Sequence, residues 1–263
     1  MKTTAILGID IQNDFTLTTG ALFVKGADAD VKRMSDFILS NQQYIDYIAF
    51  TLDSHQPIHI AHQCYWKGQE GNRPALFSTI SAADVKKDIW IPQYNIDKAL
   101  VYLEELERKG EVCTIWPMHC ILGTDGWALN RVLTDCLLEW AIDNGRSYEL
   151  FYKGYSQSTE HYSIFRAAVE WESEPETYLN TKLLSKLNEF DEVLLIGEAA
   201  DYCVANSLND ILDECTQLAR KIIIFTDCMS WINPDNERAK RIFERALSMG
   251  VRFMTSTEYN FNR

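Results

Sequence analysis

The chain carries the sequence VLLIGEAADYCV between Val193 and Val204. Its first four residues form a continuous apolar run, which is typical of a strand that is buried on both faces. Gly197 ends this run, and Cys203 opens the helical segment that follows it. A buried strand that leads directly into a helix is the repeating unit of parallel α/β sheets. The stretch therefore predicts an α/β fold in which Cys203 follows the carboxyl end of a central strand.

Comparable apolar runs recur along the chain and alternate with longer helical patterns. The predicted strands cover residues 5–9, 47–52, 150–152, 193–196, 222–225 and 251–254, and the predicted helices include 30–43, 97–109 and 235–249. Strands that alternate with helices in this way form a mostly parallel sheet with helices on both of its faces. We therefore predict a three-layer α/β fold.

The segment 63–112 interrupts this alternation. It is long and aromatic, and its helical stretch 97–109 does not belong to a simple strand–helix repeat. We expect an insertion near the functional site that forms a lid or an oligomer contact, or a peripheral helix that covers a sheet edge. No linker rich in Gly, Ser or Pro is evident, so the 263 residues, 46% of them hydrophobic, are expected to form a single domain, 1–263.

The charge balance limits the partners that the chain can bind. A formal net charge of -13 at pH 7 argues against nucleic acid and anionic membranes, whose phosphates would be repelled. The early apolar run Ala5–Ile9 is too short for a signal peptide or a membrane span. The seven cysteines have no paired CxxC spacing, which suits a reducing compartment. We expect a cytoplasmic protein that acts on a small molecule.

Residues that can carry chemistry stand where four of the predicted strands end. Asp10 and Asp53 follow the first two strands, Lys153 ends the third, and Cys203 lies beyond the fourth. The carboxyl ends of parallel strands meet at one edge of a sheet, where ligands bind in open α/β folds. A single acid at such a place often only caps a helix, and a single lysine often only ends a strand in water. The four together predict a functional site.

Cys203 is the predicted nucleophile. A thiol in the first turn of a helix has its pKa lowered from about 8.5 by the positive end of the helix dipole. Backbone N–H groups around Ala199 and Cys203 can stabilise the oxyanion that forms when the thiolate attacks a carbonyl carbon. Asp10 can hold the thiol proton, and Lys153 can supply a cation beside both groups. The alternative is that Cys203 packs as a small hydrophobic residue.

Three separated segments resemble motifs of the isochorismatase-like cysteine hydrolases, and within them of the nicotinamidases. DIQNDF at Asp10–Phe15 resembles the opening D-x-Q-x-D-F motif, and Lys153 followed by YSIF at Tyr162–Phe165 resembles the lysine segment. GEAADYCV at Gly197–Val204 resembles the G-x-A-x-D-Y-C-V motif. The resemblance implies a catalytic triad of Asp10, Lys153 and Cys203. It also implies a non-proline cis peptide between residues 198 and 199 that shapes the oxyanion hole.

A fourth segment concerns a metal ion. Asp53 and His55 stand two residues apart, and WPMHC at Trp116–Cys120 resembles the nicotinamidase W-P-x-H-C motif. The resemblance implies a divalent metal on Asp53, His55 and His119 that holds the ring nitrogen of the substrate. These ligand types suit zinc, and also iron or manganese. His59 is either a further ligand or a hydrogen-bonded histidine.

The resemblance also implies a substrate pocket and an activity. Phe15, Trp116 and Tyr162 match aromatic positions that line the ring pocket, although each is also a plausible core aromatic. The implied enzyme hydrolyses nicotinamide or a similar small amide to an acid and ammonia through a cysteine thioester, as in NAD salvage. The alternatives are a metal-dependent amidase or carbamoyl hydrolase with another substrate, and a binding protein with a vestigial site on the same fold. Relatives are commonly dimers or larger, so a homo-oligomer is possible.

Overall fold

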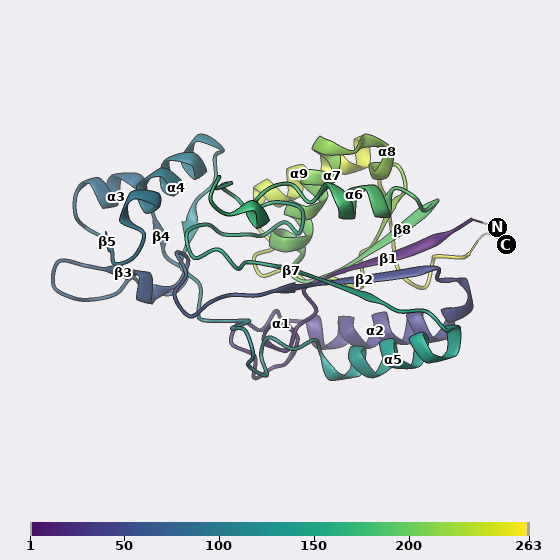
Figure 1. Cartoon of the computed structure of the whole chain (residues 1–263). Coiled ribbons are helices and arrows are strands. Elements are labelled where there is room, and N and C mark those ends of the chain that lie inside the picture. The colour runs from purple at the N-terminus through teal and green to yellow at the C-terminus, as the bar shows by residue number, and fades with distance from the viewer. Residues whose placement is uncertain (1, 262–263) are drawn as a thin grey trace.

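The computed structural model describes residues 2–261, and a six-stranded sheet forms its centre (Figure 1). The strands are β1 (Thr4–Ile9), β2 (Tyr47–Asp53), β7 (Glu149–Lys153), β8 (Glu192–Gly197), β9 (Ile222–Phe225) and β10 (Arg252–Met254). Their order in the sheet is β10-β9-β8-β1-β2-β7, and every neighbouring pair is parallel. The sequence predicted all six strands, each to within a residue at either end. The predicted parallel sheet is therefore confirmed.

Helices cover both faces of this sheet (Figure 1). On one face α2 (Ala27–Ser40) packs against α5 (Arg131–Asn144), and on the other lie α6 (Thr181–Leu187), α7 (Ala205–Glu214), α8 (Thr216–Ala219) and α9 (Glu237–Ser248). Successive strand residues point to opposite faces, so Leu195 belongs to the core beneath α7 whereas Leu194 and Ile196 belong to the core beneath α2. The three-layer arrangement is confirmed.

Two helices show why the chain folds as it does locally. In α5 the buried residues Leu133, Cys136, Leu137 and Trp140 repeat at the spacing of one helical face. The Asn130 side chain accepts a hydrogen bond from the Val132 N–H at 3.0 Å and caps the start of this helix. The predicted helices at 30–43, 97–109 and 235–249 are α2, α4 (Ile96–Arg108) and α9, with ends that differ by a few residues. Other short helices are α1 (Asn13–Thr16) and the 3-10 turns Gln42–Tyr44, Gln63–Tyr65 and Pro175–Thr177.

The predicted insertion lies at the end of the molecule opposite the amino end of β1 (Figure 1). It contains α3 (Ala82–Lys86) and α4, and two antiparallel pairs: β3 (Trp66–Lys67) with β5 (Ile91–Pro92), and β4 (Thr79–Ile80) with β6 (Cys113–Thr114). It has its own hydrophobic cluster, in which residues such as Tyr65, Trp66 and Tyr102 are buried. None of the helices between residues 2 and 261 combines the length and the apolar character that a membrane span needs.

Gly197 brings the two central strands together where the site begins. Its φ of +133° lies in a region that side chains rarely adopt, and a Cβ atom at this position would lie 2.2 Å from the carbonyl oxygen of Ile9. The Glu198 N–H donates to that same oxygen at 2.8 Å. Only glycine therefore permits the close approach that sets Asp10, after β1, beside the Cys203 segment, after β8.

Candidate active site

Lys153 lies between the other two residues of the predicted triad. Its Nζ atom is 2.9 Å from Oδ2 of Asp10 and 3.6 Å from Sγ of Cys203. All three residues are buried, and the Lys153 side chain is completely enclosed. Thr51 of β2 holds the second oxygen of Asp10, because its hydroxyl donates to Oδ1 at 2.5 Å. The structure thus brings Asp10, Lys153 and Cys203 together from β1, β7 and the segment after β8.

Burial dominates the electrostatics of this group. It raises the pKa of Asp10, although the Lys153 cation opposes the rise. It also raises the pKa of the Cys203 thiol well above its usual range, again against the attraction of Lys153. Burial lowers the pKa of Lys153, but the carboxylates of Asp10 and Asp53 outweigh that effect and hold the pKa well above its usual value. The lysine is therefore charged, and the resting thiol keeps its proton.

The protonated thiol differs from the sequence-based expectation. Cys203 does not open an α-helix: it lies within a π-helical turn, Ala200–Val204, and α7 begins only at Ala205. The thiol is 6% exposed, so the loss of solvation outweighs the attraction of the lysine. Asp10 also raises the pKa of the thiol and is the adjacent group to which the proton can pass.

Ala199 adjoins the thiol, as expected for a donor to an oxyanion. It is 2% exposed and lines the same cavity as Cys203. Its carbonyl oxygen accepts hydrogen bonds from the N–H groups of Tyr202 and Val204, which ties the loop to the π-helical turn. The peptide bond between Glu198 and Ala199 is cis, as the resemblance implied.

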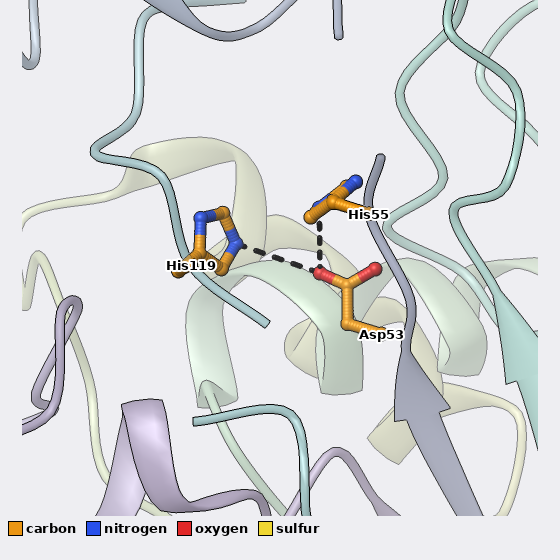
Figure 2. A group of neighbouring side chains, drawn as sticks. All are labelled: Asp53, His55 and His119. Carbon is orange, nitrogen blue, oxygen red and sulfur yellow. Dashed lines mark ion pairs between the residues drawn. The ribbon is translucent and has the colours of Figure 1, made fainter. Parts of the chain in front are cut away.

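Asp53, His55 and His119 point toward one another (Figure 2). Oδ2 of Asp53 is 3.0 Å from Nε2 of His55 and 3.5 Å from Nε2 of His119. Nδ1 of His119 lies 2.8 Å from the Pro117 carbonyl oxygen and donates to it, and Nε2 faces Asp53. One ligand atom from each residue lies within 4.8 Å of the others. A buried carboxylate and two imidazoles in this arrangement fit a divalent metal such as zinc.

Lys153 connects this group to the triad. Its Nζ atom lies 3.1 Å from Oδ1 of Asp53, on the oxygen that does not face the two histidines. Burial would raise the pKa of Asp53, but His55 and Lys153 together hold it well below its usual value. Asp53 is therefore ionised, as a metal ligand must be.

His59 is held by the backbone. Its Nδ1 accepts the Ala61 N–H at 3.2 Å, and its Nε2 lies 3.2 Å from the Thr159 carbonyl oxygen. Both ring nitrogens are thus engaged, which favours the hydrogen-bonded histidine over the ligand. Ligand atoms of His55, His59 and Glu160 nevertheless form a second compact group. Glu160 is 2% exposed, and its Oε2 has no hydrogen-bond partner between residues 2 and 261.

The three predicted aromatic residues line one cavity. Phe15, Trp116 and Tyr162 lie around it with Cys203 and His119; the other lining residues are Leu22, Asp53, Glu160, Ala199, Tyr202 and Ile232. The Trp116 indole N–H donates to the Tyr162 hydroxyl at 2.9 Å, which fixes both rings. A flat ring in this cavity would therefore have aromatic walls, with the thiol and the metal ligands nearby.

Sequence reasoning missed two residues of this region. Phe77, from the insertion, contacts Trp116 edge-on with ring centroids 5.9 Å apart, although Phe77 itself is 57% exposed. Glu160 lies in an irregular segment between β7 and α6. Periodicity places neither residue, because both stand outside regular elements, and the contact with Trp116 depends on how the insertion folds back.

Comparisons with known proteins agree with this geometry. No protein-family model matches the chain. The nicotinamidase of Escherichia coli (strain K12) is 24% identical over 262 residues, which is 98% of each chain. The structure of a nicotinamidase/pyrazinamidase from Acinetobacter baumanii has a TM-score of 0.64 at 22% identity and covers 98% of both chains. A pyrazinamidase of Pyrococcus horikoshii in complex with zinc has a TM-score of 0.55 at 19% identity, covering 96% of this chain and 98% of that one.

Fold, motif order and sequence similarity lead to the same assignment. The structural matches cover nearly the whole chain and share its fold. The sequence match also runs along nearly the whole chain, and the four motifs stand at the strand ends where the site is built. The chain therefore has the fold of these nicotinamidase structures, and its sequence is similar to that of the nicotinamidases along nearly its whole length.

Proposed function

We propose that this chain hydrolyses nicotinamide, or a closely similar small amide, to the carboxylic acid and ammonia. The observation that carries the proposal is the position of Lys153 Nζ, 2.9 Å from Asp10 and 3.6 Å from the Cys203 thiol. The thiol lines an aromatic cavity that His119 also lines. A nucleophile, a proton acceptor and a cation thus lie together, and the nucleophile lines a cavity with aromatic walls.

The first half of the proposed reaction forms a thioester. Sγ of Cys203 attacks the amide carbon while its proton passes to Asp10, and the carbonyl electron pair moves onto oxygen. The backbone N–H groups of Ala199 and Cys203 stabilise that oxyanion. When the carbonyl re-forms, the C–N bond breaks and the nitrogen takes the proton from Asp10. Ammonia leaves, and the acyl group remains on sulfur.

The second half restores the thiol. A water molecule gives a proton to Asp10 and attacks the thioester carbon, and the C–S bond then breaks. The sulfur takes the proton back from Asp10, and the carboxylic acid is released. Lys153 stays charged throughout, because the Asp53 carboxylate remains beside it while Asp10 holds a proton. It offsets the negative charge that moves between Asp10 and Cys203.

Asp53, His55 and His119 would hold a divalent metal, for which we propose zinc. When bound, the metal would supply a Lewis acid for the ring nitrogen and orient the amide toward Cys203. Phe15, Trp116 and Tyr162 would position the ring by stacking. We further propose a single domain, 1–263, that works in the cytoplasm, since the seven cysteines are all free thiols within residues 2–261.

Ammonia release from nicotinamide, pyrazinamide and unrelated small amides tests the proposal. Wild-type protein loaded with zinc should release ammonia from the ring amides, and Cys203→Ala should not. Cys215→Ala is the matched control, because Cys215 is a free thiol at the junction of α7 and α8, and it should keep wild-type activity. Absence of turnover of every amide by the metal-loaded wild type would refute the amidase. If the protein turned over a carbamoyl compound but no amide, the proposed substrate class would change from amides to carbamoyl compounds.

A further inference from the structure

Glu198 is a buried carboxyl group within the loop that carries Ala199. It is 0% exposed and follows Gly197 directly at the end of β8. Its Oε2 accepts the Ser230 N–H at 3.0 Å, whereas its Oε1 has no donor among residues 2–261. A buried carboxylate normally has an ion-pair partner or several donors, because desolvation of the charge is costly. The proposed reaction does not use this group.

A second carboxyl group faces it. Asp30 of α2 is 2% exposed, and Ser230 contacts both groups: its N–H donates to Oε2 of Glu198 at 3.0 Å, and its hydroxyl donates to Oδ2 of Asp30 at 2.5 Å. Two carboxyl groups held this close repel each other when both are ionised, and a proton on one of them would let them hydrogen bond. Arg33 forms an ion pair with Asp30, whereas Glu198 has no ion pair among residues 2–261. Glu198 is therefore the member of the pair that lacks a cation.

Ser230 joins this pair to the backbone of Ala200, the residue after Ala199. Its N–H donates to Glu198, and its carbonyl oxygen accepts the Ala200 N–H at 2.8 Å. Just before this, the Gly197 N–H donates to the carbonyl oxygen of Cys228 at 3.0 Å. The loop after β9 thus holds residues 197–200 through three hydrogen bonds, two to backbone N–H groups and one to the Glu198 side chain. Ala199, the proposed donor to the oxyanion, lies between the residues that these hydrogen bonds hold.

We propose that Glu198 is a positioning residue, which shares its proton with Asp30 and thereby holds the Ala199 backbone in place for the reaction. The role rests on the proposed function, because it acts through the oxyanion donor. The titratable and charged groups around the pair are Arg33 on α2 and Asp227 and Cys228 in the loop after β9. Burial first, and then the charge of Asp30, raise the pKa of Glu198 well above its usual value.

The raised pKa gives a stability signature whose sign is fixed. Between the ordinary pKa of a glutamate and the raised value, the folded chain binds more protons than the unfolded chain, so stability falls as pH rises. Glu198→Gln keeps the shape, an acceptor for Ser230 and a donor for Asp30, but it has nothing to titrate. The Tm of this variant relative to wild type should therefore rise by about 3 °C for each pH unit in that window.

Glu192→Gln is the matched control. Glu192 is a buried acid at the other end of β8, and Lys2 and Arg252 form ion pairs with it. Burial opposes ionisation there, but these partners hold the pKa of Glu192 below its usual value. The Tm difference between Glu192→Gln and wild type should thus stay constant between about pH 6 and 9. A Glu198→Gln series that is equally flat would refute the shared proton.

Kinetics test the positioning role. Glu198→Leu cannot accept the Ser230 N–H or donate to Asp30. We therefore expect its kcat to fall about tenfold, with KM within about twofold of wild type. This fall in kcat is smaller than the one caused by removing an oxyanion donor itself. Glu198→Gln should restore kcat at pH 7, and Ser230→Ala, which keeps the backbone bonds, should lie between them. An unchanged kcat in Glu198→Leu, or a change in KM alone, would overturn the role. If wild type hydrolyses no amide, the positioning role fails together with the proposed function. The Tm series would still show whether Glu198 and Asp30 share a proton.

Discussion

Replacing Lys153 by methionine would remove the cation that touches both buried carboxylates while keeping most of the volume of the side chain. Nζ lies 2.9 Å from Asp10 and 3.1 Å from Asp53, and the lysine side chain is completely enclosed. Loss of one partner of a buried ion pair costs about 3–5 kcal/mol, because the remaining charge is left without compensation. A chain of this size loses about 2–4 °C in Tm for each kcal/mol. We therefore expect the Tm of metal-free Lys153→Met to fall by about 10 °C.

The assay is thermal unfolding of four proteins: wild type, Lys153→Met, Asp10→Asn and the double variant. Asp10→Asn alone removes a partner of Lys153 and should destabilise the chain. In the Lys153→Met background the same change removes an uncompensated carboxylate, so it should cost less or even stabilise. The two substitutions should therefore be strongly non-additive. Equal effects of Asp10→Asn in both backgrounds would refute the coupling.

Lys186→Met is the control for the loss of a lysine. Lys186 is 39% exposed in its side chain and pairs with Glu189 on the surface. Exposed pairs contribute about 0–1 kcal/mol, so its Tm should stay within a few degrees of wild type. If Lys153→Met unfolds as close to wild type as this control, the buried ion pairs do not carry the stability that the geometry assigns to them.

Two further outcomes follow from the pocket and the metal ligands. Removal of metal with a chelator should lower both the Tm and the amidase activity, and added zinc should restore both. In His119→Ala, added zinc should restore neither the Tm nor the activity. If elemental analysis finds as much bound metal in His119→Ala as in wild type, His119 is not a ligand. Phe77→Ala should raise KM for ring amides severalfold with kcat unchanged, because its ring supports Trp116 without touching the thiol. Equal KM values for the variant and wild type would mean that the insertion does not shape the pocket.

Regular elements of this fold could be predicted from the sequence, but the environment of each group could not. Apolar runs of three to six residues placed the six strands, and the strand ends placed Asp10 and Lys153 at one edge. The helix α5 was missed although its apolar residues have helical spacing. The raised pKa of Cys203 was also missed, since burial depends on segments that pack over the thiol from elsewhere in the chain. Phe77 lies beyond such reasoning, because an exposed loop residue gives no periodic pattern.

The insertion leaves and rejoins the body of the protein between two of the proposed metal ligands. His55 stands before it and His119 after it, and the two chain segments run side by side there: the His55 N–H donates to the Cys120 carbonyl oxygen, and the Leu122 N–H donates to the His55 carbonyl oxygen, both at 3.1 Å. An ion held by both histidines would link the two chain segments that connect the insertion to the rest of the protein. It would restrict the motion of the insertion as well as orient a ring, because it adds a further link between the ends of a long loop. Metal binding and the mobility of the insertion would then be linked, so that a bound metal makes the insertion less mobile and a change that loosens the insertion weakens metal binding.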